Sequence, residues 1–296
     1  MTSRATLVRV LGLFDATMLV VGCIVGVGIF RTASSIAAHL HAPSLILALW
    51  VVGGLVSLCG SLCYAELSTL FPQSGGDYVY ITQGYGRFWG FLFGWTKLFI
   101  ERTGTIAILG FVFAEYLGRL LPMSPVALRA VASGAIVGLT AVNVLGVRRG
   151  TAVQNVFTVL KIGALVSVVA TGVMALAGGR GAAVDWHLPA LTLPVIQSSG
   201  VAFVFVLWTF GGWTEAAYVA EEIRDPSRTL PRSIIGGLAL VTVLYLLVNV
   251  SYLVCVDIAE LPTTTLVASH VLERLWGNPG AAFIAFPIVA TQIYMF

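Results

Sequence analysis

Eight long apolar stretches, separated by short polar connections, constrain the fold of this chain more than any other feature. A helix needs about 20 apolar residues to cross a bilayer core of about 30 Å. Stretches of that length occur at residues 12–38, 43–70, 88–118, 125–145, 153–177, 194–220, 233–256 and 279–296. They are continuous, whereas a transmembrane β-strand is an alternating segment of about ten residues. The sequence therefore predicts an all-α polytopic membrane protein with seven complete spans and an eighth within which the chain ends.

The composition excludes most soluble classes. Apolar residues make up 58% of the chain and charged residues only 10%, whereas a soluble domain carries about 25% charged residues. The net charge of +3 is too small to indicate a nucleic-acid partner, so the lipid bilayer is the expected surrounding. Cys59 and Cys63 stand four residues apart without a matching His or acidic residue. We therefore expect no metal site and no cofactor.

The distribution of basic residues predicts the orientation. Cytoplasmic connections of membrane proteins carry an excess of Lys and Arg. If the N-terminus lies inside, the inner segments carry eight arginines and the outer segments four. The sequence thus predicts a multi-pass protein of the plasma (cell inner) membrane with a cytoplasmic N-terminus.

Two of the spans contain glycines near their middle. The first holds Gly22, Gly26 and Gly28, and the sixth holds Gly211 and Gly212. Glycine is a poor helix former, although small residues also permit close packing of helices in membranes. A pair of interrupted spans five spans apart is typical of inverted-repeat transporters of the leucine-transporter type. Broken helices offer N–H groups to an anion and carbonyls to a cation, which together suit the zwitterion of an amino acid.

Several motifs give the chain a specific resemblance. They occupy residues 22–30, 64–67, 72–80, 94–95, 154–158, 210–213, 221–226 and 230–232. In this order they resemble the amino acid–polyamine–organocation (APC) superfamily, and most of all its L-type amino acid transporter branch with its bacterial relatives. The resemblance implies two inverted five-helix repeats, here a first repeat at residues 1–180 and an incomplete second repeat at 181–296. It also implies about four further spans beyond the eighth.

The resemblance also implies the binding residues. The substrate carboxylate is expected to meet the backbone N–H groups of Gly26, Val27 and Gly28. The amino group is expected to meet the carbonyls near Ile24 on the first span, and those near three residues of the sixth span. These residues are Trp208, Thr209 and Gly211, and Phe210 lies within the same segment. The resemblance also aligns Trp208 with an aromatic gate over the substrate. Val27 and Thr214 stand where many relatives have Ser and Asn, which leaves the side-chain selectivity open.

Charged residues within the spans are further candidates. Lys161 lies nine residues into the fifth span, where a buried ammonium is costly. It either reaches toward the membrane surface or, as the resemblance implies, replaces the sodium ion that related transporters bind beside the first broken helix. Glu215 stands two residues after Trp213 in the sixth span and is a candidate for the transport pathway. Lys97, Glu101 and Arg102 lie in the third span, where pairing with neighbouring helices is the alternative to a role in transport.

The predicted function is therefore sodium-independent amino acid transport by alternating access, as exchange or as proton-coupled uptake. The alternative is an inactive or unstable remnant of such a permease. We expect neither an enzyme nor a channel, because clustered histidines, paired acidic motifs and a selectivity element are all missing. The segment 118–125 contains no Cys, so no disulfide-linked heavy chain is expected.

Overall fold

The computed structural model describes residues 9–120, 123–144, 147–264 and 267–277, and this part of the chain is helical. It contains no strand, and its one isolated β-bridge joins Leu11 to Ile223. The helical elements are α1 Leu13–Ile24, α2 Gly28–His39, α3 Pro43–Leu70, α4 Asp77–Tyr85, α5 Arg87–Thr96, η1 Lys97–Arg102, α6 Thr103–Leu120, α7 Pro125–Val144, α8 Val147–Ala177, α9 Leu193–Thr209, η2 Glu215–Glu222, α10 Pro226–Cys255, η3 Leu261–Thr263 and α11 Val267–Trp276. The prediction of an all-α chain is confirmed for these residues.

The first span is broken in its middle. Helix α1 ends at Ile24 and α2 begins at Gly28, so residues 25–27 are not helical. The N–H of Gly26 bonds to the carbonyl of Ile24 at 2.8 Å, a tight turn that ends the regular hydrogen-bond ladder. The residue at the centre of this turn is Val25, with a φ of −74° and a ψ of 86°, so the turn itself does not require a glycine.

The sixth span is broken in the same way. Helix α9 ends at Thr209, residues 210–214 form turns, and a 3₁₀ helix, η2, continues to Glu222. Gly212 has a φ of +103°, a conformation that residues with a Cβ rarely adopt. The glycine motifs therefore identified both interruptions.

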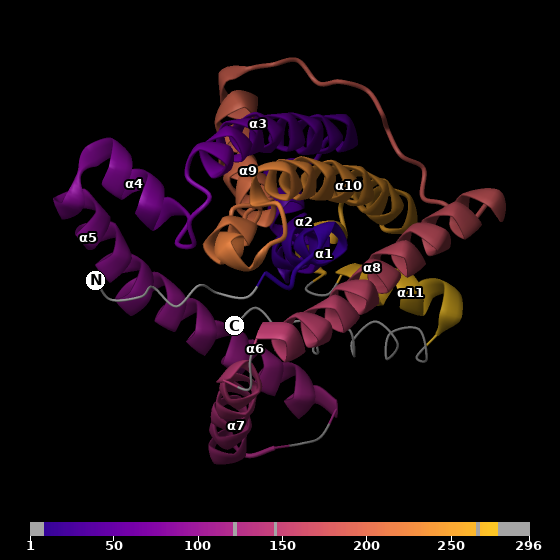
Figure 1. Ribbon diagram of the computed structural model, residues 1–296. Coiled ribbons are helices and arrows are strands. Elements are labelled where there is room, and N and C mark those ends of the chain that lie inside the picture. Colours follow the sequence, from indigo (N-terminus) through magenta and orange to yellow (C-terminus); the bar gives the residue numbers. More distant parts are fainter. Residues whose placement is uncertain (1–8, 121–122, 145–146, 265–266, 278–296) are drawn as a thin grey trace, which may run out of the picture.

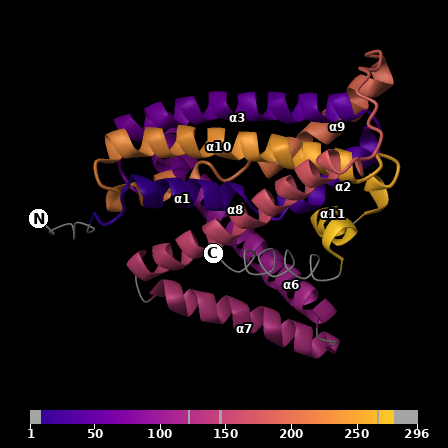
Figure 2. The ribbon, with the colours of Figure 1, turned by 90° about the vertical axis from the view of Figure 1, so that its right-hand side faces the viewer.

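Most of the helices form one packed body. Figure 2 shows α3, α10 and the α1–α2 pair as neighbouring layers, with α8 crossing them obliquely. Helix α10 is central, since it packs against α3, α1 and α8. Its buried side chains include Tyr245 and Tyr252, which are fully enclosed.

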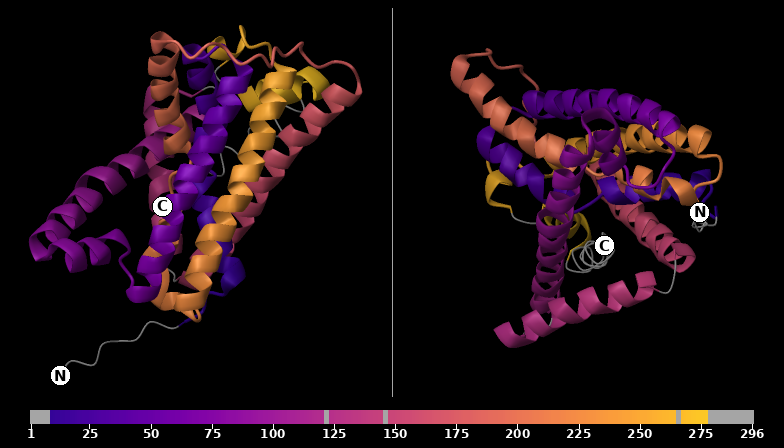
Figure 3. Two further views of the ribbon diagram at one scale, coloured as in Figure 1. Left: turned by 90° about the horizontal axis from the view of Figure 1, so that it is seen from above. Right: turned by 60° about the vertical axis from the view of Figure 1, so that its left-hand side comes forward.

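A second part stands out from this body, and we call it the arm (α4, α5, η1, α6 and α7). Figures 1 and 3 show α4 and α5 projecting to one side, and α6 and α7 lying away from the layers. Within the arm each element packs on its neighbour in sequence, and α7 leads back to α8. The segment η1 is a π-helix, a rare form that often marks a functional site.

Over the described residues, each of the first seven predicted spans overlaps helical segments, in the predicted order. Four helical segments are long and apolar enough to cross a membrane, namely 13–39, 43–70, 151–177 and 226–255, and 125–138 and 193–209 are shorter apolar helices. The seventh span was predicted to start at residue 233, but its helix α10 already begins at Pro226. Proline suits the first helical position, because no N–H is needed there. Helix α8 likewise begins before residue 153. The predicted eighth span, 279–296, lies outside the described residues.

Candidate functional site at the two helix breaks

The two breaks lie against each other in the body. A Cβ on Gly212 would stand 2.6 Å from the carbonyl oxygen of Cys23 and 3.2 Å from the nitrogen of Ile24. The backbone of the sixth-span break thus touches the end of α1. Next to this contact α2 packs on α9, and a Cβ on Gly28 would lie 3.0 to 3.2 Å from atoms of Thr209. Gly28 therefore serves close helix packing, and its missing Cβ points at Thr209.

Hydroxyl groups tie the breaks together. Thr32 donates to the carbonyl of Gly28 at 2.9 Å, and its oxygen lies 3.1 Å from the hydroxyl of Thr209. The hydroxyl of Tyr245 reaches the carbonyl of Ile24 at 2.9 Å and that of Thr209 at 3.4 Å. A tyrosine hydroxyl has one proton, so the two carbonyls share it. The hydroxyl thereby bridges the last residues of α1 and α9. The ends of these two half-helices are thereby held side by side.

The start of α2 offers unpaired donors. Among the hydrogen bonds of the described residues, the N–H groups of Val27, Gly28 and Ile29 have no acceptor. Unpaired N–H groups at a helix N-terminus carry a partial positive charge and attract anions. The N–H of Gly26, by contrast, is already bonded to Ile24. Two of the three expected carboxylate donors are therefore free.

The carbonyls expected to meet an amino group differ in the same respect. Ile24 accepts from Gly26 and Tyr245, Trp208 accepts from Gly211 at 3.1 Å, and Thr209 accepts from Tyr245. The carbonyl of Gly211 accepts no hydrogen bond from the described residues. It is the one of the four expected acceptors that an ammonium group can use without displacing another donor.

Lys161 points from α8 at the end of α1. Its side chain is 1% exposed, and its ammonium donates to the carbonyl of Gly22 at 2.8 Å. The side chain therefore does not reach the membrane surface. A cation there is stabilised by the negative end of the α1 dipole. Gly22 permits this approach, because a Cβ on it would collide with Gln154 and Thr158 of α8.

The aromatic residues of the sixth span lie on different sides. Trp208 is 62% exposed, whereas Phe210 is buried. The ring of Phe210 packs on Tyr245, with centroids 5.3 Å apart, and edge-on against Trp50 at 5.7 Å. The ring of Phe210 is thus buried between α3 and α10, whereas most of the Trp208 side chain lies at the surface of the described residues.

Glu215 joins the arm to the body. Its carboxylate bonds to the guanidinium of Arg102, and the ammonium of Lys97 lies 4.0 Å away. Both cations belong to the π-helix η1. Lys97 also pairs with Glu101 of the same helix at 2.7 Å.

Sequence reasoning missed Tyr245 and Thr32, which hold the breaks together. Tyr245, Asn249 and Tyr252 stand at positions i, i+4 and i+7 of an apolar run, so they share one helix face. All three are buried. A polar face on an otherwise apolar span was the signal that could have identified this contact.

The N-terminal segment closes against the end of η2. The carbonyl of Glu222 accepts from the N–H groups of Val10 and Leu11 at 2.9 and 3.0 Å, and Arg224 donates its N–H to Leu11. The carboxyl oxygen Oε2 of Glu222 has no hydrogen-bond partner within the described residues. Burial raises the pKa of this carboxyl.

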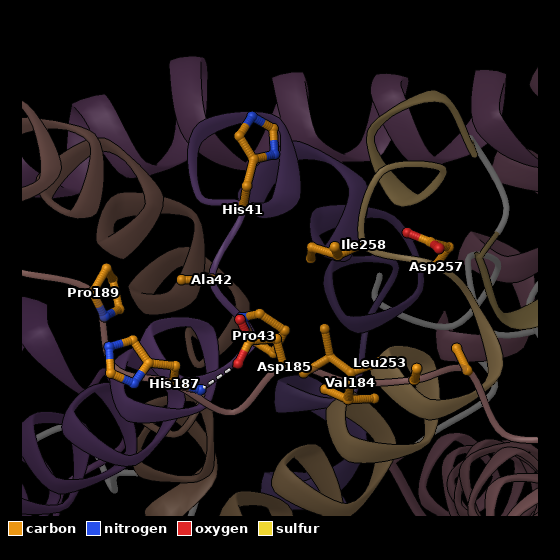
Figure 4. Close-up of a pocket in the computed structure, with 12 residues that line it drawn as sticks. His41, Ala42, Pro43, Val184, Asp185, His187, Pro189, Leu253, Asp257 and Ile258 are labelled. Atoms are coloured by element: carbon orange, nitrogen blue, oxygen red, sulfur yellow. Dashed lines mark hydrogen bonds between the residues drawn. The ribbon is translucent and has the colours of Figure 1, made fainter.

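A separate cavity of about 270 Å³ lies at the other end of the body (Figure 4). It is lined by residues from the α2–α3 connection, from 182–189 and from the end of α10, and not by either break. His187 donates its N–H to Asp185 at 2.8 Å there. Within the described residues no three His, Cys, Asp or Glu side chains are placed to hold a metal ion. We therefore assign the candidate site to the breaks.

Comparisons with known proteins agree with the transporter resemblance. Residues 11–295 match the amino acid permease family. Over 295 residues the chain is 35% identical to the human b(0,+)-type amino acid transporter 1, and the match covers 96% of this chain and 60% of the relative. It is 33% identical to the mouse Asc-type amino acid transporter 1, over 93% of this chain and 53% of the relative. It is also 34% identical to the rabbit (Oryctolagus cuniculus) large neutral amino acids transporter small subunit 2, over 90% of this chain and 51% of the relative. The chain thus spans about half to 60% of the length of these relatives, and it belongs to the amino acid permease family.

Proposed function

We propose that this chain forms the substrate-binding part of a secondary transporter that moves amino acids across the membrane by alternating access. The observation that carries the proposal is the meeting of two broken spans with opposite polarity. Free N–H groups at the start of α2 suit a carboxylate, and the carbonyls at the ends of α1 and α9 suit an ammonium group. An α-amino acid carries both groups on one carbon atom.

The binding residues follow from this geometry. Val27 and Gly28 hold the carboxylate through their N–H groups, and Gly211 accepts from the amino group. A second bond to the carbonyl of Ile24 requires Tyr245 to release it. The contacts of Trp208 do not indicate which amino acid side chain is bound.

Transport without sodium is part of the proposal. The ammonium of Lys161 supplies a fixed positive charge at the end of α1, where a bound cation would otherwise be needed. Exchange and proton-coupled uptake both remain compatible with this charge. The inverted repeats at 1–180 and 181–296, the plasma membrane location, the cytoplasmic N-terminus and the lack of a disulfide-linked heavy chain stay predictions.

The competing proposal is that the chain is an inactive remnant of such a transporter. It is motivated by the match to the human relative, which covers 60% of that protein. The test is uptake of labelled amino acids into liposomes that contain the 296-residue chain, beside a version extended to the length of its relatives. Uptake by both versions shows that the 296-residue chain transports by itself, and uptake by the extended version alone shows that the chain is inactive without the added part. Uptake by neither version contradicts the first proposal.

The zwitterion is tested by competition with analogues. An amine that lacks the carboxylate and an acid that lacks the amino group should each bind about 10- to 100-fold more weakly than the parent amino acid. This is the cost of losing one charge-assisted hydrogen bond of about 1.5–3 kcal/mol. If the amine competes as well as the amino acid, the N–H groups of α2 do not bind the substrate.

A further inference from the structure

We propose that the ion pair between Arg102 and Glu215 is a lock that closes the path from the break to the N-terminal side of the membrane. It opens when substrate is released to that side. The inference rests on the proposed function, because alternating access requires such a closure. It names the two residues that form it and the two parts that separate.

The lock joins two parts of the structure that otherwise meet in few places. Glu215 begins η2, the second half of the sixth span, and belongs to the body. Arg102 ends η1 and belongs to the arm, whose helices pack mainly on one another. The cationic groups of Lys97 and Arg102 also lie over the ring of Tyr218 in η2, at 5.4 and 5.8 Å from its centroid. One carboxylate thus holds two cations of the arm.

The π-helix explains how both cations reach this carboxylate. Lys97 and Arg102 are five residues apart, and on an α-helix they would point in different directions. The i→i+5 hydrogen bonds of a π-helix bring residues at this spacing onto one side. The irregular turn in the third span therefore has a function in this proposal, namely to direct two cations at Glu215.

A second contact between arm and body lies near the chain connection and acts as the hinge. Asp77 of α4 accepts hydrogen bonds from Tyr64 of α3 and from Tyr218 of η2, the latter at 2.8 Å. Residues 71–76 join α3 to α4 directly, so this contact can persist while Arg102, farther along the arm, moves away.

The lock lies next to the candidate site. The N–H of Glu215 bonds to the carbonyl of Gly212 at 3.2 Å, and Gly212 touches Cys23 at the end of α1. Cys23 therefore lies at the contact between α1 and the residues that lead into η2, and it is partly exposed. The side chains of the lock are 34% and 21% exposed, so the pair is only partly desolvated. Such pairs are of modest strength and can open and reform in each cycle.

Cys23 is therefore a native probe of the lock. In a background with Cys59, Cys63 and Cys255 replaced by Ser, a membrane-impermeant maleimide is applied from either side of sealed vesicles. Glu215→Gln and Arg102→Gln should each raise the labelling rate of Cys23 from the N-terminal side by about fivefold. That corresponds to about 1 kcal/mol of lost ion pairing. Labelling from the opposite side should not rise.

The controls separate access from reactivity. The two substitutions change the electrostatic potential at the sulfur in opposite directions, so only an opened path raises labelling in both. Glu101→Gln removes an acidic residue of the same helix that pairs with Lys97 within the arm, and it should leave the rate unchanged. The exchanged pair, Arg102→Glu with Glu215→Arg, should restore slow labelling.

Labelling that stays slow in both single variants would overturn the lock. So would a fast rate in the exchanged pair when size-exclusion profiles show that it is folded. The assay requires no transport. If labelling rises but no amino acid slows or speeds it, the lock stands and the proposed function fails.

Discussion

The close approach of the two breaks can be tested by adding one methyl group. Gly212→Ala forces a residue with a Cβ into a φ of +103°, which costs about 1–2 kcal/mol. The same Cβ would lie 2.6 Å from the carbonyl oxygen of Cys23, where ordinary contacts begin at 3.4 Å. Separating the backbones costs about 1–3 kcal/mol more. We therefore expect the free energy of unfolding to fall by about 2–5 kcal/mol.

The measurement is the melting temperature of the detergent-solubilised chain. At about 2–4 °C per kcal/mol, Gly212→Ala should melt about 4–20 °C lower than the native chain. Gly200→Ala is the matched control in α9, since no described atom lies within 4 Å of its new Cβ. It should be neutral or stabilising by up to about 1 kcal/mol, because alanine favours a helix. Equal melting temperatures for the two variants would show that the breaks do not touch.

Three further predictions concern single groups. Lys161→Met should weaken amino acid binding at least about tenfold, and unchanged binding in equilibrium dialysis would contradict this. The melting temperature should change little, because the lost charge-assisted bond is offset by the removed cost of burying an ammonium. Cysteines introduced at Arg149 and Ser227 should be labelled from the side of the N-terminus and one at Ala183 from the other side; labelling of Arg149 and Ala183 from one side would refute the predicted topology. Burial raises the pKa of Glu222 above its ordinary 4.5, so the folded chain binds this proton more tightly, and stability should fall as the pH rises from about 4.5 through the raised value. Glu222→Gln should flatten that part of the melting curve against pH, and an unchanged slope would refute the assignment.

The apolar helices and the position of both breaks could be predicted from the sequence for simple physical reasons. The thickness of the bilayer sets the length of an apolar helix. Glycines are poor helix formers, and Gly26 lies in the first break while Gly212 has a φ of +103° in the second. Both properties are local, so neither depends on knowing which helices are neighbours.

The partners of each break could not be predicted in this way. The hydroxyl of Tyr245 reaches Ile24 across 221 positions of the sequence, and Arg102 reaches Glu215 across 113. Such contacts depend on how α10 and the arm are placed against α1 and η2. Gly28 illustrates the same limit, because the sequence suggests a ligand beside it and the structure shows Thr209. Trp208 is the opposite case, a proposed gate whose side chain is 62% exposed.

The arrangement of hydrogen bonds at the breaks has a consequence for transport. Both lone pairs of the Ile24 carbonyl are in use, one by Gly26 within the same span and one by Tyr245 from α10. An arriving ammonium group can compete with the tyrosine but not easily with the turn that forms the break. If the tyrosine hydroxyl yields, it loses its bond to α1 and keeps the longer one to Thr209. Binding of the amino group would then loosen α1 from α10 while α9 stays attached. Under the proposed function, substrate binding and movement of the first half-helix are thus linked through one hydroxyl group.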